Sequence, residues 1–141
     1  MASFISHLTI DCSDAYSLSA WWKPVLGYED VPDDPNLPGH DECMIVDPAG
    51  RGMTVLFIEV PEGKSVKNRL HLDLRPRADL RDTEIERLIA HGATVVGDHR
   101  GQYGPGTGWV TLADPEGNEF CVLRSEAEVA ERPEPADAAD A

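Results

Sequence analysis

Two histidines stand at equivalent places in a sequence that nearly repeats itself. His7 lies in Ser6-His7-Leu8-Thr9-Ile10-Asp11, and His71, 64 residues later, lies in Leu70-His71-Leu72-Asp73-Leu74-Arg75. A neutral imidazole can ligate zinc, nickel, iron or manganese, and it can equally serve as a hydrogen-bonding group in a cleft. The paired placement predicts a pseudo-two-fold pocket that receives one histidine from each half of the chain.

The elements that would position these histidines also recur. Each histidine segment is followed by a helix-like stretch that closes on a glycine, Gly27 or Gly92, and then by an Asp-Pro-x-Gly turn at 47–50 or 114–117. Hydrophobic periodicity therefore predicts a β-α-β-β-β order in each half. The expected strands are residues 3–12, 28–33, 42–47 and 53–60, then 68–75, 93–98, 108–113 and 118–124. The expected helix caps are Ser13 or Asp14 and Asp79 or Asp82, with Ile85, Leu88 and Ile89 of the second helix facing inward.

Alternation along the first strand of each half separates an apolar face from a polar one. The leucine-rich face should meet the helix, so the face that carries His, Asp and Arg should line a ligand cleft. Asp11 and Asp73 could orient an imidazole or act as a general base, or could pair with Arg75. Trp109 and Thr111 are expected to line the cleft from the seventh strand.

Length and composition restrict the class of protein. The 141 residues predict a single domain at 1–125, with modules at 3–62 and 66–125, and an acidic, disordered tail at 126–141. The net charge of −14 argues against nucleic-acid or anionic-membrane partners. Three unpaired cysteines and no visible signal peptide predict a cytoplasmic protein. The glycine-rich segment 100–108 lacks a phosphate-loop lysine, which favours a flexible lid or a plain hairpin over a nucleotide cradle.

Four segments carry a family resemblance. They are Phe4-Ile5-Ser6-His7-Leu8, Trp22-Lys23-Pro24-Val25-Leu26-Gly27-Tyr28, Val66 to Leu74, and Asp114-Pro115-Glu116-Gly117-Asn118-Glu119-Phe120. Over residues 3–125 the chain resembles the vicinal oxygen chelate superfamily, which includes glyoxalase I, bleomycin-resistance proteins and extradiol dioxygenases. The resemblance implies an α+β fold of two βαβββ modules forming a U-shaped mixed sheet. It also implies a homodimer and, in enzymatic members, a divalent metal held by His and Glu.

The resemblance also suggests which residues would hold the metal. His7 and His71 stand where metal-binding members carry strand ligands. The ligand glutamate of the last strand is replaced by Cys121, which could be a thiolate ligand or simply a small apolar residue. Glu119, two residues earlier on the same strand face, could serve as ligand or general base. A fourth ligand position falls on Ile58, with Glu59 on the opposite face.

Three functions remain open at this stage. The first is a metal-dependent lyase or isomerase of glyoxalase type, without an organic cofactor, acting on a small oxygen-bearing substrate. In it His7, His71 and Cys121 hold the metal and Glu119 and Asp73 are catalytic. The substrate-binding residues would be Asp11, Arg75, Trp109, Thr111 and Ile58. The second is a metal-free protein that binds an antibiotic-type small molecule, and the third is an accessory interaction domain.

Overall fold

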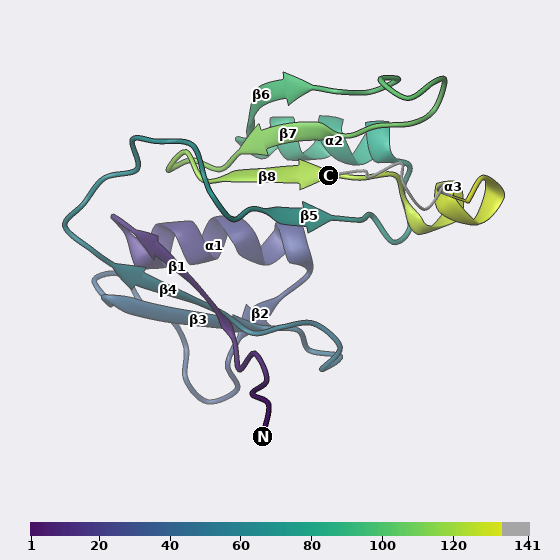
Figure 1. Cartoon of the computed structure of the whole chain (residues 1–141). Coiled ribbons are helices and arrows are strands. Elements are labelled where there is room, and N and C mark those ends of the chain that lie inside the picture. The colour runs from purple at the N-terminus through teal and green to yellow at the C-terminus, as the bar shows by residue number, and fades with distance from the viewer. Residues whose placement is uncertain (134–141) are drawn as a thin grey trace. The chain divides into compact units, whose positions relative to one another are not determined.

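The computed structural model describes residues 1–133, which fall into two compact units, residues 1–65 and the residues from 66 onward (Figure 1). Each unit contains its own four-stranded mixed sheet and a helix packed on it. None of the helices in the described residues has the length and apolar character needed to cross a bilayer.

The first unit runs β1 (Leu8–Cys12), α1 (Ala15–Leu26), β2 (Glu29–Asp30), β3 (Glu42–Val46) and β4 (Val55–Glu59). Its sheet has the order β1-β4-β3-β2, in which β1 and β4 are parallel and the other pairs are antiparallel. The strands are shorter than the sequence predicts, since β1 begins only at Leu8 and β2 has two residues.

The second unit repeats this plan with β5 (Leu72–Leu74), α2 (Arg81–Ala90), β6 (Thr94–Asp98), β7 (Val110–Ala113) and β8 (Glu119–Val122). Its sheet order, β5-β8-β7-β6, is the order of the first unit, again with one parallel pair between the first and last strands. The predicted α+β class with two βαβββ modules is therefore confirmed.

The two Asp-Pro-x-Gly turns are equivalent in detail. Gly50 donates its N–H to the Asp47 carbonyl at 2.9 Å, and Gly117 donates to the Asp114 carbonyl at 2.9 Å. In both turns the aspartate carboxylate accepts further backbone N–H groups from the residues that follow. Each aspartate thus fixes the turn that leads into the last strand of its module, as expected from Asp side chains in turns.

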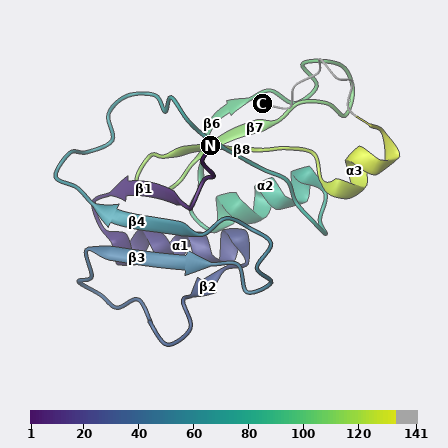
Figure 2. The same ribbon diagram turned by 60° about the horizontal axis from the view of Figure 1, so that its bottom comes forward.

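Helix α1 runs along one face of the first sheet (Figure 2) and has the predicted cap. Asp14 accepts the Ser17 N–H at 3.0 Å, and this backbone bond holds the pKa of the Asp14 carboxyl below its usual value. The helix ends at Gly27, whose φ of 69° is readily adopted only by glycine. Trp22 from the helix and Phe57 from β4 are among the largest buried side chains of the unit.

Helix α2 differs from the sequence prediction at two points. Ile85 and Leu88 are buried as expected, but Ile89 is 43% exposed and does not belong to the inward face. Neither Asp79 nor Asp82 caps the helix, since the N-cap residue is Leu80 without a side-chain capping bond. The carboxylate of Glu128 accepts the Arg81 N–H at 2.9 Å instead.

Glu128 belongs to a third helix, α3 (Glu126–Glu131), which lies within the segment 126–141 that was predicted to be an acidic, disordered tail. The Ser125 hydroxyl accepts the Glu128 N–H and the Glu128 carboxylate accepts the Ser125 N–H, which is a complete capping box. Residues 126–131 are therefore helical, and the rest of the predicted tail, from residue 134 onward, lies outside the described residues.

Candidate metal and ligand site

Three neighbouring strands of the second unit bring polar side chains into one row. Asp73 on β5 lies opposite Cys121 on β8, and Cys121 lies opposite Thr111 on β7. The Thr111 hydroxyl and the Cys121 thiol are 3.4 Å apart. This row lies on the face of the sheet that alternation assigns to polar side chains, away from Phe120 and Val122.

His71 completes the row at its β5 edge. The residue immediately precedes β5, and its Nε2 lies 3.4 Å from Asp73 Oδ1. One ligand atom each from His71, Asp73 and Cys121 can be chosen so that all three lie within 4.8 Å of one another. The His71 and Asp73 side chains are about one-third exposed, and Cys121 is buried.

Burial sets the protonation of the thiol in this cluster. Removal from water raises the pKa of Cys121, and the bond with Thr111 opposes that rise while the negative charge of Asp73 adds to it. A metal ion would reverse the balance, because a coordinated thiol is deprotonated.

Glu119, the other carboxylate predicted for this site, forms an ion pair with Lys67. Lys67 Nζ donates to Glu119 Oε2, and the Glu119 side chain is only 11% exposed against 72% for Lys67. The Asn68 side-chain oxygen accepts the Glu119 N–H at 3.3 Å. Segment 67–68 therefore holds both the carboxylate and the backbone of Glu119 at the start of β8.

A cavity of about 450 Å³ opens beside these residues, lined by Val66, Lys67, Asn68, Arg69 and His71. Its volume falls within the range of small-molecule pockets. The sequence prediction did not include Lys67, Asn68 or Arg69. The available signal was the run 64–71, which holds Lys64, Lys67 and Arg69 but no acid in a strongly acidic chain.

Trp109, which was predicted to line the cleft, stacks on two other rings of the β6–β7 hairpin, those of His99 and Tyr103. Its ring centroid lies 4.7 Å from that of His99 and 6.3 Å from that of Tyr103, with interplanar angles of 27° and 28°. Alternation places Trp109 on the same face as Thr111. His99 could not be selected from the sequence, because its stacking on Trp109 depends on the register of β6 and β7.

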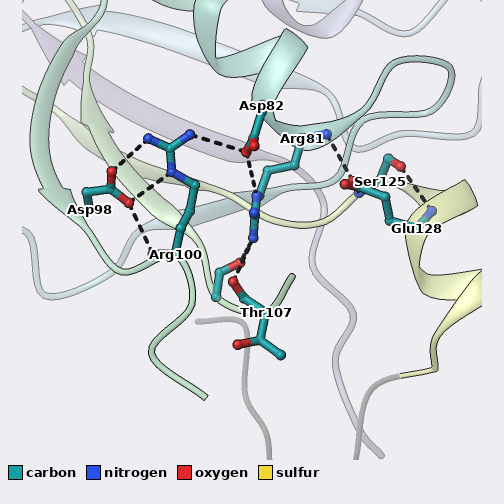
Figure 3. A network of polar contacts seen from close by, with 8 residues as sticks. Arg81, Asp82, Asp98, Arg100, Thr107, Ser125 and Glu128 are labelled. Atoms are coloured by element: carbon teal, nitrogen blue, oxygen red, sulfur yellow. Dashed lines mark hydrogen bonds and ion pairs between the residues drawn. The ribbon is translucent and has the colours of Figure 1, made fainter. Parts of the chain in front are cut away.

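Arg81 and Arg100 make polar contacts at the base of the β6–β7 connection, with Thr107 and with Asp98 and Asp82 (Figure 3). The buried Arg81 donates from Nη1 to the carbonyls of Thr107 and Gly108, both at 2.8 Å. Arg100 bonds Asp98 at 2.7 Å and Asp82 at 3.2 Å. The loop is the connection of an antiparallel hairpin, in agreement with the hairpin alternative.

Arg75 directly follows the last residue of β5, Leu74. Its Nη1 donates to the Arg124 carbonyl at 2.6 Å, which ties β5 to the chain just beyond β8. This bond gives Arg75 a structural contact in addition to its predicted role in substrate binding.

The first unit contains the other predicted residues. His7 is exposed, immediately precedes β1 as His71 precedes β5, and has its Nδ1 3.1 Å from Ser6 Oγ. Asp11 lies opposite Ile58 in the β1–β4 pair. Glu59 accepts the Ala15 N–H at 3.1 Å and so faces α1, on the side opposite to Ile58.

Comparison with solved structures finds the same fold in proteins of low sequence identity. FosX of Listeria monocytogenes, a fosfomycin resistance protein crystallised as its E126Q mutant with Mn(II) and 1S,2S-dihydroxypropylphosphonic acid, is 19% identical. That match covers 94% of this chain and 98% of the other, with a TM-score of 0.65. FosX of Mesorhizobium loti is 16% identical over 94% and 100% of the two chains, with a TM-score of 0.63. A possible glyoxalase of Bacillus cereus is 17% identical over 86% and 99%, with a TM-score of 0.61.

No curated protein matches the chain significantly. The model of the glyoxalase-like domain, however, matches residues 7–123, which is most of the chain and includes both modules. The chain therefore belongs to the glyoxalase-like domain family, within the vicinal oxygen chelate superfamily.

Proposed function

We propose that this protein is a metal-dependent lyase or isomerase of glyoxalase type, acting on a small oxygen-bearing substrate. The observation that carries the proposal is the cluster of His71, Asp73 and Cys121, whose ligand atoms lie within 4.8 Å of one another. A relative of the same fold was crystallised with Mn(II) and an oxygen-rich small molecule, which supports this class of chemistry.

The donor set fits a zinc ion better than the manganese of that relative. Nitrogen, oxygen and sulfur donors together suit a borderline-soft metal, whereas manganese prefers carboxylate, carbonyl and water oxygens. Three atoms within 4.8 Å of one another have a common point about 2.8 Å or less from each, so small side-chain movements would reach zinc bonds of about 2.0–2.3 Å. The sequence adds His7, from the first unit, as a proposed further donor.

The protein side chains around the cluster have separable tasks. A bound divalent metal would act as a Lewis acid toward a substrate oxygen. Glu119, on the same face of β8 as Cys121, is the carboxylate that would move a proton, and its partner in the ligand-free protein is Lys67. Asp73 would be a ligand or a second base, while Trp109 and Thr111 would contact the substrate.

Metal analysis of protein purified without chelator tests this function. We expect close to one equivalent of zinc, lost in His71→Ala and Cys121→Ser and retained in His40→Ala, which removes an exposed histidine of a loop. Cobalt substitution should give a thiolate charge-transfer band that Cys121→Ser abolishes. Less than ~0.2 equivalents of metal, unchanged by His71→Ala, would remove the proposal. A His7→Ala protein with lowered zinc affinity would support the fourth donor.

The alternative is a metal-free protein that binds an amphipathic small molecule. It is favoured by the engagement of Glu119 with Lys67 and by the aromatic stack on Trp109. Thermal-shift measurements separate the two functions, because an enzyme of the first kind is stabilised by zinc, whereas the alternative predicts stabilisation by an aromatic or peptidic drug alone.

Dimerisation and a cytoplasmic location are further proposals that follow from the resemblance and the free cysteines. Light scattering of the purified protein would show whether the particle has twice the 15.4 kDa mass of one chain.

A further inference from the structure

We propose that the cavity lined by residues 66–69 and His71 receives an oxyanion of the substrate, a carboxylate or a phosphoryl-type group, and that this group takes Lys67 from Glu119. The inference deepens the proposed function and depends on it for the identity of the ligand as substrate. It names the chemical class of the ligand from the charge and contacts of the second unit.

The first support is the charge of the cavity wall. The chain has 26 acids against 12 basic residues, yet the cavity is lined by Lys67, Arg69, Asn68 and His71 with Val66 and no acid. Positive charge in a concave site concentrates anionic ligands. Because Glu119 already pairs with Lys67 and Asp73 lies 3.4 Å from His71, the cation of this wall that has no acidic partner among the described residues is Arg69.

The second support is that this wall already binds a carboxylate of the protein itself. Lys67 Nζ donates to Glu119 Oε2, while Asn68 accepts the Glu119 N–H from the backbone side. The Lys67 side chain is 72% exposed, so its ammonium can turn toward a ligand at little cost in packing. An incoming oxyanion would replace Glu119 as its partner.

The third support is Arg69. Its side chain is exposed, and within residues 1–133 its guanidinium makes no ion pair or hydrogen bond. A planar guanidinium binds carboxylate and phosphoryl oxygens in bidentate fashion, which a lysine cannot do. Arg69 and Lys67, two residues apart, thus offer one fork and one point charge to the same ligand group.

The position of the cavity links this subsite to the metal donors. His71 belongs both to the cavity wall and to the cluster with Asp73 and Cys121. A ligand whose anionic end is bound by Lys67 and Arg69 therefore extends toward His71. The exchange also releases Glu119 from its ion pair only when a substrate is present, which leaves its carboxylate free to move a proton.

Calorimetric titration at constant ionic strength tests the inference with three probes: acetate, methylphosphonate and neutral acetamide. We expect saturable binding of at least one anion and none of acetamide. Arg69→Gln and Lys67→Gln should weaken the binding about tenfold. Arg77→Gln is the control, since Arg77 is an exposed arginine of the same unit that lies 3.9 Å from Glu126. The preferred anion distinguishes a carboxylate from a phosphonate subsite.

Glu119→Gln should have the opposite effect on anion affinity from Lys67→Gln and Arg69→Gln. Because it removes the carboxylate that competes for Lys67, we expect it to tighten anion binding several-fold. The titrations are run on zinc-loaded and chelator-treated protein. Anion binding in both forms supports the subsite whatever the metal analysis shows, whereas a failed metal analysis refutes only the metal-dependent function. Absence of saturable anion binding, or wild-type affinity in both Arg69→Gln and Lys67→Gln, overturns the subsite. Weaker binding by Glu119→Gln overturns the exchange.

Discussion

Cys121 illustrates how far single residues of the site could be read from the chain. The resemblance to the vicinal oxygen chelate superfamily placed it at the ligand position of the last strand, and the structure brings its sulfur beside His71 and Asp73. Asp73 entered the prediction as a possible base and emerges as a ligand candidate, because its register with Cys121 is a property of the β5–β8 pair. That register pairs strands that are far apart in sequence, so it could not be predicted from local sequence.

The ion pair between Asp98 and Arg100 should make the stability of the fold depend on pH. Three hydrogen bonds from Arg100, two from its guanidinium and one from its backbone N–H, lower the pKa of Asp98 to about 2. Because this folded-state pKa lies below the value of the unfolded chain, the charged carboxylate stabilises the fold above pH ~4. That contribution is lost as the pH falls from about 4 toward 2.

We therefore expect Asp98→Asn to be less stable than wild type in urea unfolding at neutral pH, with the two free energies converging as the pH falls toward 2. The difference should be modest, since the Asp98 side chain is 46% exposed and screened by solvent. A carboxyl titration followed by NMR, with a midpoint near 3.8, would contradict the assignment.

At the scale of elements, local patterns predicted the strands, the Asp14 cap and both Asp-Pro-x-Gly turns, because each depends on residues close together in sequence. The predicted cap of α2 was wrong because the group that caps this helix is distant in sequence. Its acceptor is Glu128, 47 residues after Arg81, so no local motif could reveal it. The inward orientation predicted for Ile89 was wrong, because the buried face of α2 is narrower than its stripe of apolar residues and leaves Ile89 exposed.

Glu128 is accordingly predicted to stabilise two helices at once. Its carboxylate accepts the N–H groups of Arg81 and Ser125, so Glu128→Ala should lower the free energy of unfolding by about 1–2 kcal/mol. Glu128→Gln should recover part of this, since an amide oxygen still accepts. Glu131→Ala, in the same helix and exposed, is the matched control and should change little. Equal stabilities of the two alanine variants in urea would show that the double cap is dispensable.

The duplication determines what sequence can predict for the molecule as a whole. Equal motif spacing predicted two modules, and the two sheets indeed share one strand order. His7 and His71 each precede the first strand of their own module, as the repeat requires. The joint pocket of the two histidines stays a prediction, because periodicity describes each module and not the placement of one against the other.

The net charge of the whole chain should make its thermal stability depend on salt concentration. Six of the acids lie in residues 29–42 without a single Lys or Arg, and the net charge of −14 should destabilise the folded state by self-repulsion. Raising sodium chloride from about 10 to 150 mM shortens the screening length from about 30 to 8 Å, so it should weaken this repulsion. We expect the Tm of metal-free protein to rise by roughly 2–4 °C, or about 1 kcal/mol.

Replacing three exposed acids of that segment, with Asp34→Asn, Asp41→Asn and Glu42→Gln, changes the net charge from −14 to −11 and should reduce the salt effect. The opposite result is also informative, because salt weakens favourable pairs such as Lys23–Asp30 and Arg100–Asp98. A Tm that falls with salt would mean that these local attractions outweigh the repulsion among the remaining acids. Calorimetric scans of the two proteins at both salt concentrations decide which of the two terms is larger.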